Sequence, residues 1–168
     1  MTVAGRVGES PKGDNEDMPV PRPMRVLFVC IGNAYRSQMA EAFARTLGRD
    51  LLVAESAGLT PVFELPESTL QVMREKGIDI SAQFPKSVVR LDVKSYDMVV
   101  NMTGLSIPSL SSDHTRNWVV PDPVGRPDSM LREVRDEIES LVMGLVLELR
   151  RSMEQREQPR LNPKLRGV

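Results

Sequence analysis

The segment that decides the fold of this chain runs Val26-Leu27-Phe28-Val29-Cys30-Ile31-Gly32-Asn33-Ala34-Tyr35-Arg36-Ser37. Its first four residues are apolar without polar interruption, which is typical of a central parallel strand covered on both faces. From Ser37 onward, apolar residues recur at spacings of three and four as far as Leu47, and Gly48 ends this pattern as a C-terminal cap would. The segment therefore predicts a buried strand, a short polar loop and a helix.

Similar patterns recur further along the chain. An apolar run at residues 51–54 predicts a second strand, and a second helix is expected to open at Pro66 and to stop at Gly77. Two more strands are predicted over residues 96–100 and 117–120, the second ending at Pro121. The last helix should span about twenty residues, because one apolar stripe runs along it. The stripe consists of Leu131, Val134, Ile138, Leu141, Leu145 and Leu149.

Strands that alternate with helices predict an α/β fold, in which a parallel sheet has helices on both faces. In such sheets ligands bind beyond the carboxyl ends of the strands, where Cys30 lies. Residues 1–22 are rich in Gly, Pro and charge, so we expect a disordered leader there. We expect the catalytic domain at residues 23–151 and a second disordered tail at residues 152–168.

Composition limits the classes of function. The 168 residues suit one domain, and a net charge of -1, from 22 basic and 23 acidic residues, argues against nucleic acid as a partner. No apolar run precedes the first strand, so we expect a cytoplasmic protein without a membrane contact. The chain has one cysteine and one histidine, which cannot supply an internal disulfide or a zinc site of the usual kind. We therefore expect no metal.

The loop after the first strand is expected to bind an oxyanion. A short polar loop that runs into a helix start points successive backbone N–H groups inward, which makes an anion cradle. The residues that would supply this cradle are Ile31, Gly32, Asn33, Ala34 and Tyr35. Gly32 lets the backbone approach the anion closely, and Arg36 adds a planar fork of donors that matches two oxygens of phosphate or arsenate.

Cys30 is the candidate nucleophile, because the helix dipole and Arg36 together favour its anionic form. Ser37 could donate its hydroxyl to this thiolate, and it could also cap the helix. Asn33 tolerates a left-handed backbone and could bond across the loop, although it could equally be a simple turn residue.

Cleavage of a phosphate ester also needs an acid for the leaving oxygen. Asp122, displayed between Pro121 and Pro123 with Gly125 closing the turn, is the best candidate. It would protonate the departing alkoxide and then accept a proton from the water that attacks the cysteinyl-phosphate. The alternative is that Asp122 is only a turn residue.

The stretch from Val29 to Glu41 resembles the signature of the low-molecular-weight protein tyrosine phosphatase superfamily, which includes the thioredoxin-coupled arsenate reductases. Further motifs follow in the order of that family: Ser56-Ala57-Gly58, Gly77-Ile78-Asp79-Ile80-Ser81, Asp97-Met98-Val99-Val100, Trp118 and Asp122-Pro123-Val124-Gly125. The resemblance spans roughly residues 24–150. It implies a flavodoxin-like three-layer sandwich with a four-stranded parallel sheet, in which Cys30 is the nucleophile, Arg36 the oxyanion clamp and Asp122 the general acid.

Three departures from the family pattern bear on function. The segments 38–41 and 132–138 look more like the reductases, yet the two relay cysteines of those enzymes are missing from residues 101–108. Val124 and Gly125 stand where tyrosine phosphatases commonly carry aromatic residues. Tyr35 stands where many members have a second cysteine.

Three functions remain open at this stage. The function that we predict is that of a cysteine-dependent phosphatase, which hydrolyses small phosphate monoesters or protein phosphotyrosine through a cysteinyl-phosphate. The second is an arsenate reductase in which Cys30 attacks arsenate and an external thiol, from glutaredoxin or a small molecule, resolves the adduct. The third is a non-catalytic oxyanion-binding module. None of them needs a cofactor, apart from the thiol reductant of the second.

Overall fold

Four parallel strands form the centre of the computed structural model, which describes residues 22–157. They are β1 (Met24–Cys30), β2 (Leu52–Gly58), β3 (Met98–Asn101) and β4 (Thr115–Asn117), in the spatial order β2-β1-β3-β4. The apolar run of β1 is fully buried between two neighbouring strands. The predicted α/β fold with a four-stranded parallel sheet is thereby confirmed.

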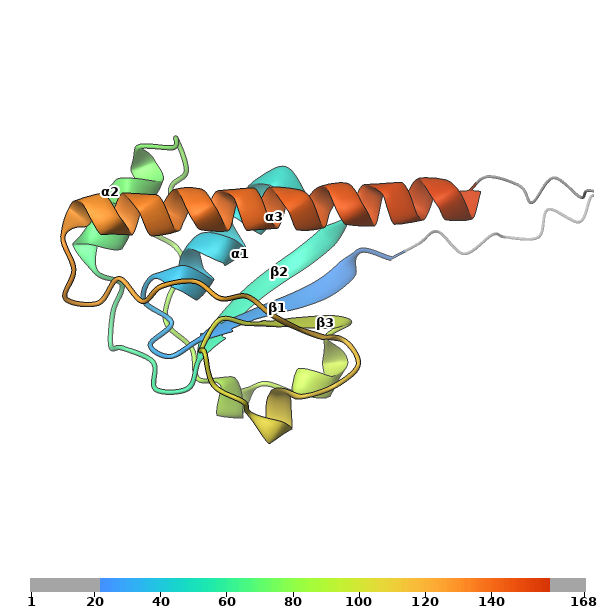
Figure 1. Ribbon diagram of the computed structural model, residues 1–168, viewed down its shortest axis with the longest axis horizontal. Coiled ribbons are helices and arrows are strands. Elements are labelled where there is room, and N and C mark those ends of the chain that lie inside the picture. Colours follow the sequence, from blue (N-terminus) through green and yellow to red (C-terminus); the bar gives the residue numbers. More distant parts are fainter. Residues whose placement is uncertain (1–21, 158–168) are drawn as a thin grey trace, which may run out of the picture.

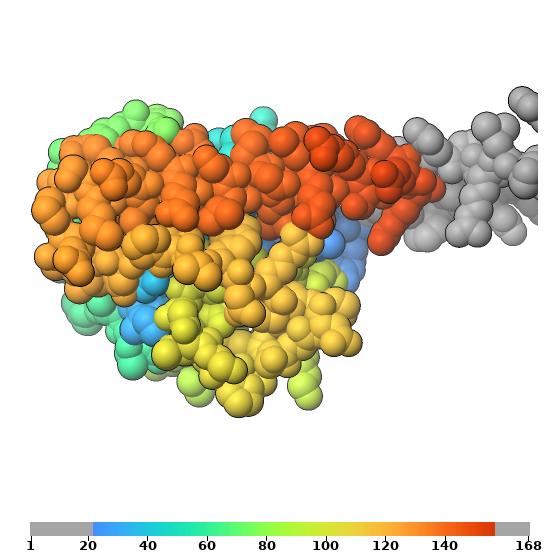
Figure 2. All heavy atoms as spheres, in the orientation of Figure 1, coloured from blue at the N-terminus to red at the C-terminus, as the bar shows by residue number. Residues whose placement is uncertain are grey.

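The α-helices pack together on one face of the sheet. They are α1 (Arg36–Leu47), α2 (Glu67–Arg74) and α3 (Asp128–Glu157). In Figure 1, α3 runs along the described part of the molecule, and α1 lies close beside it. In the space-filling view of Figure 2 the atoms of α3 form one continuous ridge. The larger hydrophobic core lies between these helices and the sheet, around Phe28, Phe43 and Ile138.

The prediction of helices on both faces is wrong as far as α-helices are concerned, because the other face of the sheet has no α-helix within residues 22–157. Three 3₁₀-helices and their loops cover it instead: Val88–Arg90, Val93–Ser95 and Pro108–Leu110. They enclose a smaller apolar cluster around Leu27, Val29 and Val99. The segments on this side contain no apolar repeat long enough for an amphipathic helix, so the third layer is built from short turns.

The fourth strand lies earlier than its predicted position at residues 117–120. It ends at Asn117, although the backbone N–H of Trp118 still donates to the carbonyl of Asn101. Beyond that point the guanidinium of Arg36 donates to the carbonyl of Met102, after β3, and to the carbonyl of Val120, after β4. It therefore lies between the segments that follow these two strands. The β-branched pair 119–120 therefore leaves the sheet.

The last helix is longer than the predicted twenty residues, because α3 has 30. Arg150 pairs with Asp50 at 2.7 Å, and Met153 packs against the larger core, so residues beyond the apolar stripe still have contacts that hold them. The prediction that a disordered tail begins at residue 152 is therefore wrong for residues 152–157. The rest of that tail, and the leader as far as residue 21, lie outside the described residues.

Charged side chains tie the elements together. Asp97, just before β3, accepts hydrogen bonds from the guanidinium of Arg22 at 2.7 and 2.8 Å and from the backbone N–H of Arg25 at 2.7 Å. Between α2 and α3, Glu75 pairs with Arg132 and Arg135, which lowers the pKa of Glu75 to about 2.

No helix within residues 22–157 is both long and apolar enough to cross a membrane.

Candidate active site

Cys30 is the last residue of β1, and the loop that follows it leads directly into α1 at Arg36. The side chain of Cys30 faces the larger core, and the residue is only 2% exposed. Ser37 and Asn33 are fully buried beside it, while Ile31, Gly32 and Tyr35 are partly exposed. The structure thus gathers the sequence-predicted loop residues around one thiol at the carboxyl edge of the sheet.

The first three carbonyls of the loop are held by the segment that follows β2. The N–H of Leu59 donates to Cys30 O at 3.2 Å, and the N–H of Thr60 donates to Ile31 O at 2.9 Å. The N–H of Val62 donates to Gly32 O at 3.0 Å. Pro61, which has no N–H, occupies the one position in this run that donates nothing.

The remaining carbonyls are held by the helices. Gln38 Nε2 donates to Asn33 O at 3.1 Å, Thr69 Oγ1 to Ala34 O at 2.9 Å, and the N–H of Met39 to Tyr35 O at 3.0 Å. In a trans peptide the C=O of one residue and the N–H of the next point in opposite directions. Because each of the six carbonyls faces a donor, the N–H groups of residues 31–36 face the other way.

This arrangement has the geometry expected of an anion cradle. The N–H groups of Gly32, Asn33, Ala34 and Tyr35 find no acceptor within the described part of the chain. Successive unpaired N–H groups at a helix start bind phosphate-like anions. A Cβ at Gly32 would lie 3.6 Å from Val62 Cγ1, an ordinary contact, so packing within the protein does not require a glycine at this position.

Asn33 closes the loop through its backbone and its side chain. Its φ of 46° is left-handed, as the sequence suggested for an asparagine. Its Nδ2 donates to Ser37 Oγ at 2.7 Å and to Ser56 Oγ at 2.9 Å, and its Oδ1 accepts from the N–H of Lys86 at 2.7 Å. Asn33 is therefore more than a simple turn residue, because its side chain bonds to Ser37 of α1, to Ser56 of β2 and to the backbone of Lys86.

Ser37 lies next to the thiol, with Oγ 2.9 Å from Cys30 Sγ. The same Oγ accepts from Asn33, which leaves its own proton free for the sulfur. A hydroxyl that donates to a thiolate stabilises the anion. Tyr35 is the N-cap of α1 and Ser37 its second residue, so Ser37 does not cap the helix.

Arg36 is 5% exposed and is fixed by three acceptors. Its Nη1 donates to Met102 O at 2.9 Å and to Val120 O at 3.2 Å, and its Nη2 donates to Asp122 Oδ2 at 2.6 Å. A guanidinium carries five N–H groups. The Nε–H and the second Nη2–H therefore remain for two oxygens of a bound anion.

The structure brings Asp122 to the cradle through this ion pair. Its Oδ1 accepts from the N–H of Val124 at 3.1 Å, and its side chain is 44% exposed. Gly125, with a φ of 69°, closes the turn as expected. A half-exposed carboxylate beside the Arg36 guanidinium is placed where it could exchange protons with solvent and reach a leaving group.

Sequence reasoning missed several residues that support the loop. A Cβ on Gly58 would lie 2.8 Å from both Asn33 N and Ile31 O, so only glycine fits there. Ser56 donates to the buried carboxylate of Glu41, which pairs with Arg45 at 2.6 Å. The motif Ser56-Ala57-Gly58 was a signal that pointed to Gly58 and Ser56. Thr69 gave no signal, because nothing local marks a helix threonine that bonds 35 residues away.

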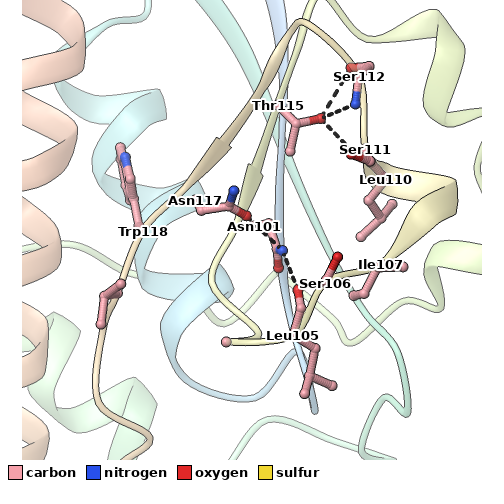
Figure 3. Close-up of a pocket in the computed structure, with 12 residues that line it drawn as sticks. Asn101, Leu105, Ser106, Ile107, Leu110, Ser111, Ser112, Thr115, Asn117 and Trp118 are labelled. Atoms are coloured by element: carbon pink, nitrogen blue, oxygen red, sulfur yellow. Dashed lines mark hydrogen bonds between the residues drawn. The ribbon is translucent and has the colours of Figure 1, made fainter.

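A hollow of about 400 Å³ lies at the carboxyl ends of β3 and β4, and Cys30, Arg36 and Asp122 do not line it. In Figure 3, Asn101 points toward Asn117 and Leu105, and its Nδ2 donates to the side chain of Asn117 and to the carbonyl of Leu105. Most of residues 101–108, where the relay cysteines were expected, line the hollow, and its lining contains no thiol.

Two other side chains lie away from this chemistry. Trp118 packs on Phe28 with 5.8 Å between ring centroids, and His114 is exposed.

Comparisons with known proteins agree with this geometry. The family described as low molecular weight phosphotyrosine protein phosphatase matches residues 25–155. The chain is 33% identical over 129 residues to the glutaredoxin arsenate reductase of Synechocystis sp., a match that covers 74% of this chain and 98% of that protein. It is 34% identical over 117 residues to an arsenate reductase of Staphylococcus aureus, which covers 67% of this chain and 88% of the relative.

Solved structures give the same picture. An arsenate reductase in a phosphate-binding state superimposes with a TM-score of 0.69 at 32% identity, covering 75% of this chain and 98% of the other. The YwlE arginine phosphatase of Geobacillus stearothermophilus gives 0.70 at 25% identity, covering 82% and 99%. With the whole α/β unit matched and the cysteine loop inside the match, this chain belongs to the low molecular weight phosphotyrosine protein phosphatase family, whose superfamily includes the arsenate reductases.

Proposed function

We propose that the protein is an arsenate reductase that uses Cys30 as its nucleophile and a thiol from another molecule as its reductant. The observation that carries this proposal is the likeness, above 30% identity, to curated proteins named arsenate reductases. The sequence alone led us to predict a phosphatase, whereas these relatives favour a reductase. The cradle, the buried thiol and the Arg36 fork provide what attack on a tetrahedral oxyanion needs.

The chemistry balances with two external thiols. The Cys30 thiolate attacks arsenic(V), and one oxygen leaves as water after protonation. An external thiolate then attacks Cys30 Sγ, so that an S–S bond forms while the S–As bond breaks and leaves its electron pair on arsenic, which departs as arsenite. A second thiol opens the mixed disulfide and restores Cys30. In total, arsenate and two thiols give arsenite, one disulfide and one water.

The number of cysteines sets the reductant. Cys30 is the only cysteine among 168 residues, so no thiol of this chain can attack its arsenic adduct. The Synechocystis relative is named a glutaredoxin arsenate reductase, which supports glutaredoxin or a small-molecule thiol as the partner. A free thiol nucleophile also fits work in a reducing compartment, the cytoplasm.

The test follows arsenite production by the purified protein. We expect turnover with glutathione or another small thiol plus glutaredoxin, none with thioredoxin and its reductase alone, and none from Cys30→Ser. Intact mass should detect Cys30 joined to the external thiol. Strong turnover with thioredoxin alone would refute glutaredoxin or a small-molecule thiol as the required partner, and no arsenite under any condition would refute the reductase itself.

A phosphatase acting on phosphate monoesters, including protein phosphotyrosine, is the second candidate. It is favoured by the Arg36–Asp122 contact, which places an acid beside the clamp, and by the likeness to the YwlE arginine phosphatase. Hydrolysis of para-nitrophenyl phosphate in a protein that forms no arsenite would select it.

A further inference from the structure

The fourth and fifth of the six carbonyls of the cradle, those of Asn33 and Ala34, differ from the others in how they are held. Gln38, from α1, donates to Asn33 O, and Thr69, from α2, donates to Ala34 O, both through side chains. The other four carbonyls accept backbone N–H groups. Gln38 and Thr69 are both fully buried, so bulk solvent does not reach either residue.

Each of these bonds sets the direction of one peptide group. With Asn33 O turned onto Gln38, the N–H of Ala34 points to the cradle side, and with Ala34 O turned onto Thr69, the N–H of Tyr35 does the same. The peptide planes at these positions have no neighbouring strand to fix them. A side chain is therefore the only group in the described structure that orients each one.

We propose that Thr69 and Gln38 are positioning residues that aim the Tyr35 and Ala34 N–H groups at the bound oxyanion. Thr69 makes α2 part of the site, although α2 contributes no group that touches the anion. The inference rests on the proposed function only in taking the cradle as the place where arsenate or phosphate binds.

Thr69 offers a clean substitution. Valine matches threonine in shape and lacks the hydroxyl, so Thr69→Val leaves Ala34 O buried without a donor and its peptide free to turn. Loss of one aimed N–H should weaken anion binding about tenfold, which corresponds to about 1.4 kcal/mol. Thr69→Ser keeps the Oγ and should bind within about twofold of wild type. Gln38→Met should weaken binding in a similar way through the N–H of Ala34.

Thr46 provides a matched control on the exposed end of α1. Its Oγ1 also donates to a backbone carbonyl, that of Ala42, at 2.9 Å. Thr46→Val makes the same chemical change away from the cradle and should leave anion binding unchanged. Melting temperatures of all variants then allow binding to be compared where each protein is fully folded.

The experiment is calorimetric titration of the full chain with inorganic phosphate, together with the amide ¹H shift of Tyr35. We expect the Tyr35 amide to move downfield on phosphate binding in wild type and Thr69→Ser, and to move little in Thr69→Val. The inference would be overturned if folded Thr69→Val bound phosphate with wild-type affinity and its Tyr35 amide moved downfield as far as in wild type. The cradle itself would stand. Failure of wild type to bind phosphate would instead reject the cradle, and the proposed function with it.

Discussion

Arg36 Nη2 lies 2.6 Å from Asp122 Oδ2, so the candidate clamp and the candidate acid are in direct contact although 86 residues separate them in sequence. The same guanidinium holds the carbonyls at the end of β3 and before Asp122. Arg36 therefore positions the loop that carries Asp122, in addition to its proposed role in binding the anion.

Arg36→Lys should reduce turnover by at least about 10²-fold, because an ammonium cannot serve two carbonyls, a carboxylate and two anion oxygens together. Steady-state kinetics with arsenate, or with para-nitrophenyl phosphate, measures this loss. Kinetics like those of wild type would mean that Arg36 is not the clamp.

Asp122→Asn should slow phosphate-ester cleavage by roughly 10²–10⁴-fold, the usual value of a positioned acid. The loss should be smaller for para-nitrophenyl phosphate than for phenyl phosphate, because the better leaving group needs less protonation. Equal losses for the two esters would show that Asp122 does not protonate the departing oxygen.

Gly58→Ala should destabilise the fold by roughly 1–3 kcal/mol, because its Cβ would lie 2.8 Å from Ile31 O and Asn33 N, both backbone atoms of the cradle. Urea denaturation measures the change. Gly144→Ala is the control, since its Cβ meets nothing within 4 Å in the interior of α3. It should stabilise the protein by about 0.5–1 kcal/mol, and an equal effect of both substitutions would contradict the packing argument.

Asp97→Asn should make stability less dependent on pH. The hydrogen bonds from Arg22 lower the pKa of Asp97 from 3.8 to about 2. A carboxyl with a depressed folded-state pKa stabilises the protein above its unfolded pKa, and this contribution is lost as the pH falls toward the folded value. The variant should therefore be less stable by about 1 kcal/mol at neutral pH, and this difference should vanish between about pH 4 and pH 2. Urea midpoints measured across this range test it, and a constant difference would contradict it.

The sequence predicted what local pattern controls. The run from Val26 to Leu47 contains its own strand, loop and helix signals, so the position of Cys30 and the start of α1 agree with the prediction to within one residue. The end of β4 was misplaced because a contact from Arg36, not propensity, decides where residues 118–120 go. The bond from Thr69 to Ala34 and the pair of Arg36 with Asp122 join distant segments, and no periodicity records such contacts.

The strap of residues 59–62, whose N–H groups hold the first three carbonyls of the cradle, also affects how the protein opens. Amide protons in surface loops normally exchange with solvent through local fraying, at little cost. The amide protons of Leu59, Thr60 and Val62 are hydrogen-bonded to the cradle loop. Gln38 and Thr69 in turn bond this loop to α1 and α2. Exposing these amide protons requires the cradle to come apart. Their deuterium exchange should therefore be as slow as that of the central strands, and it should slow further when an oxyanion occupies the site.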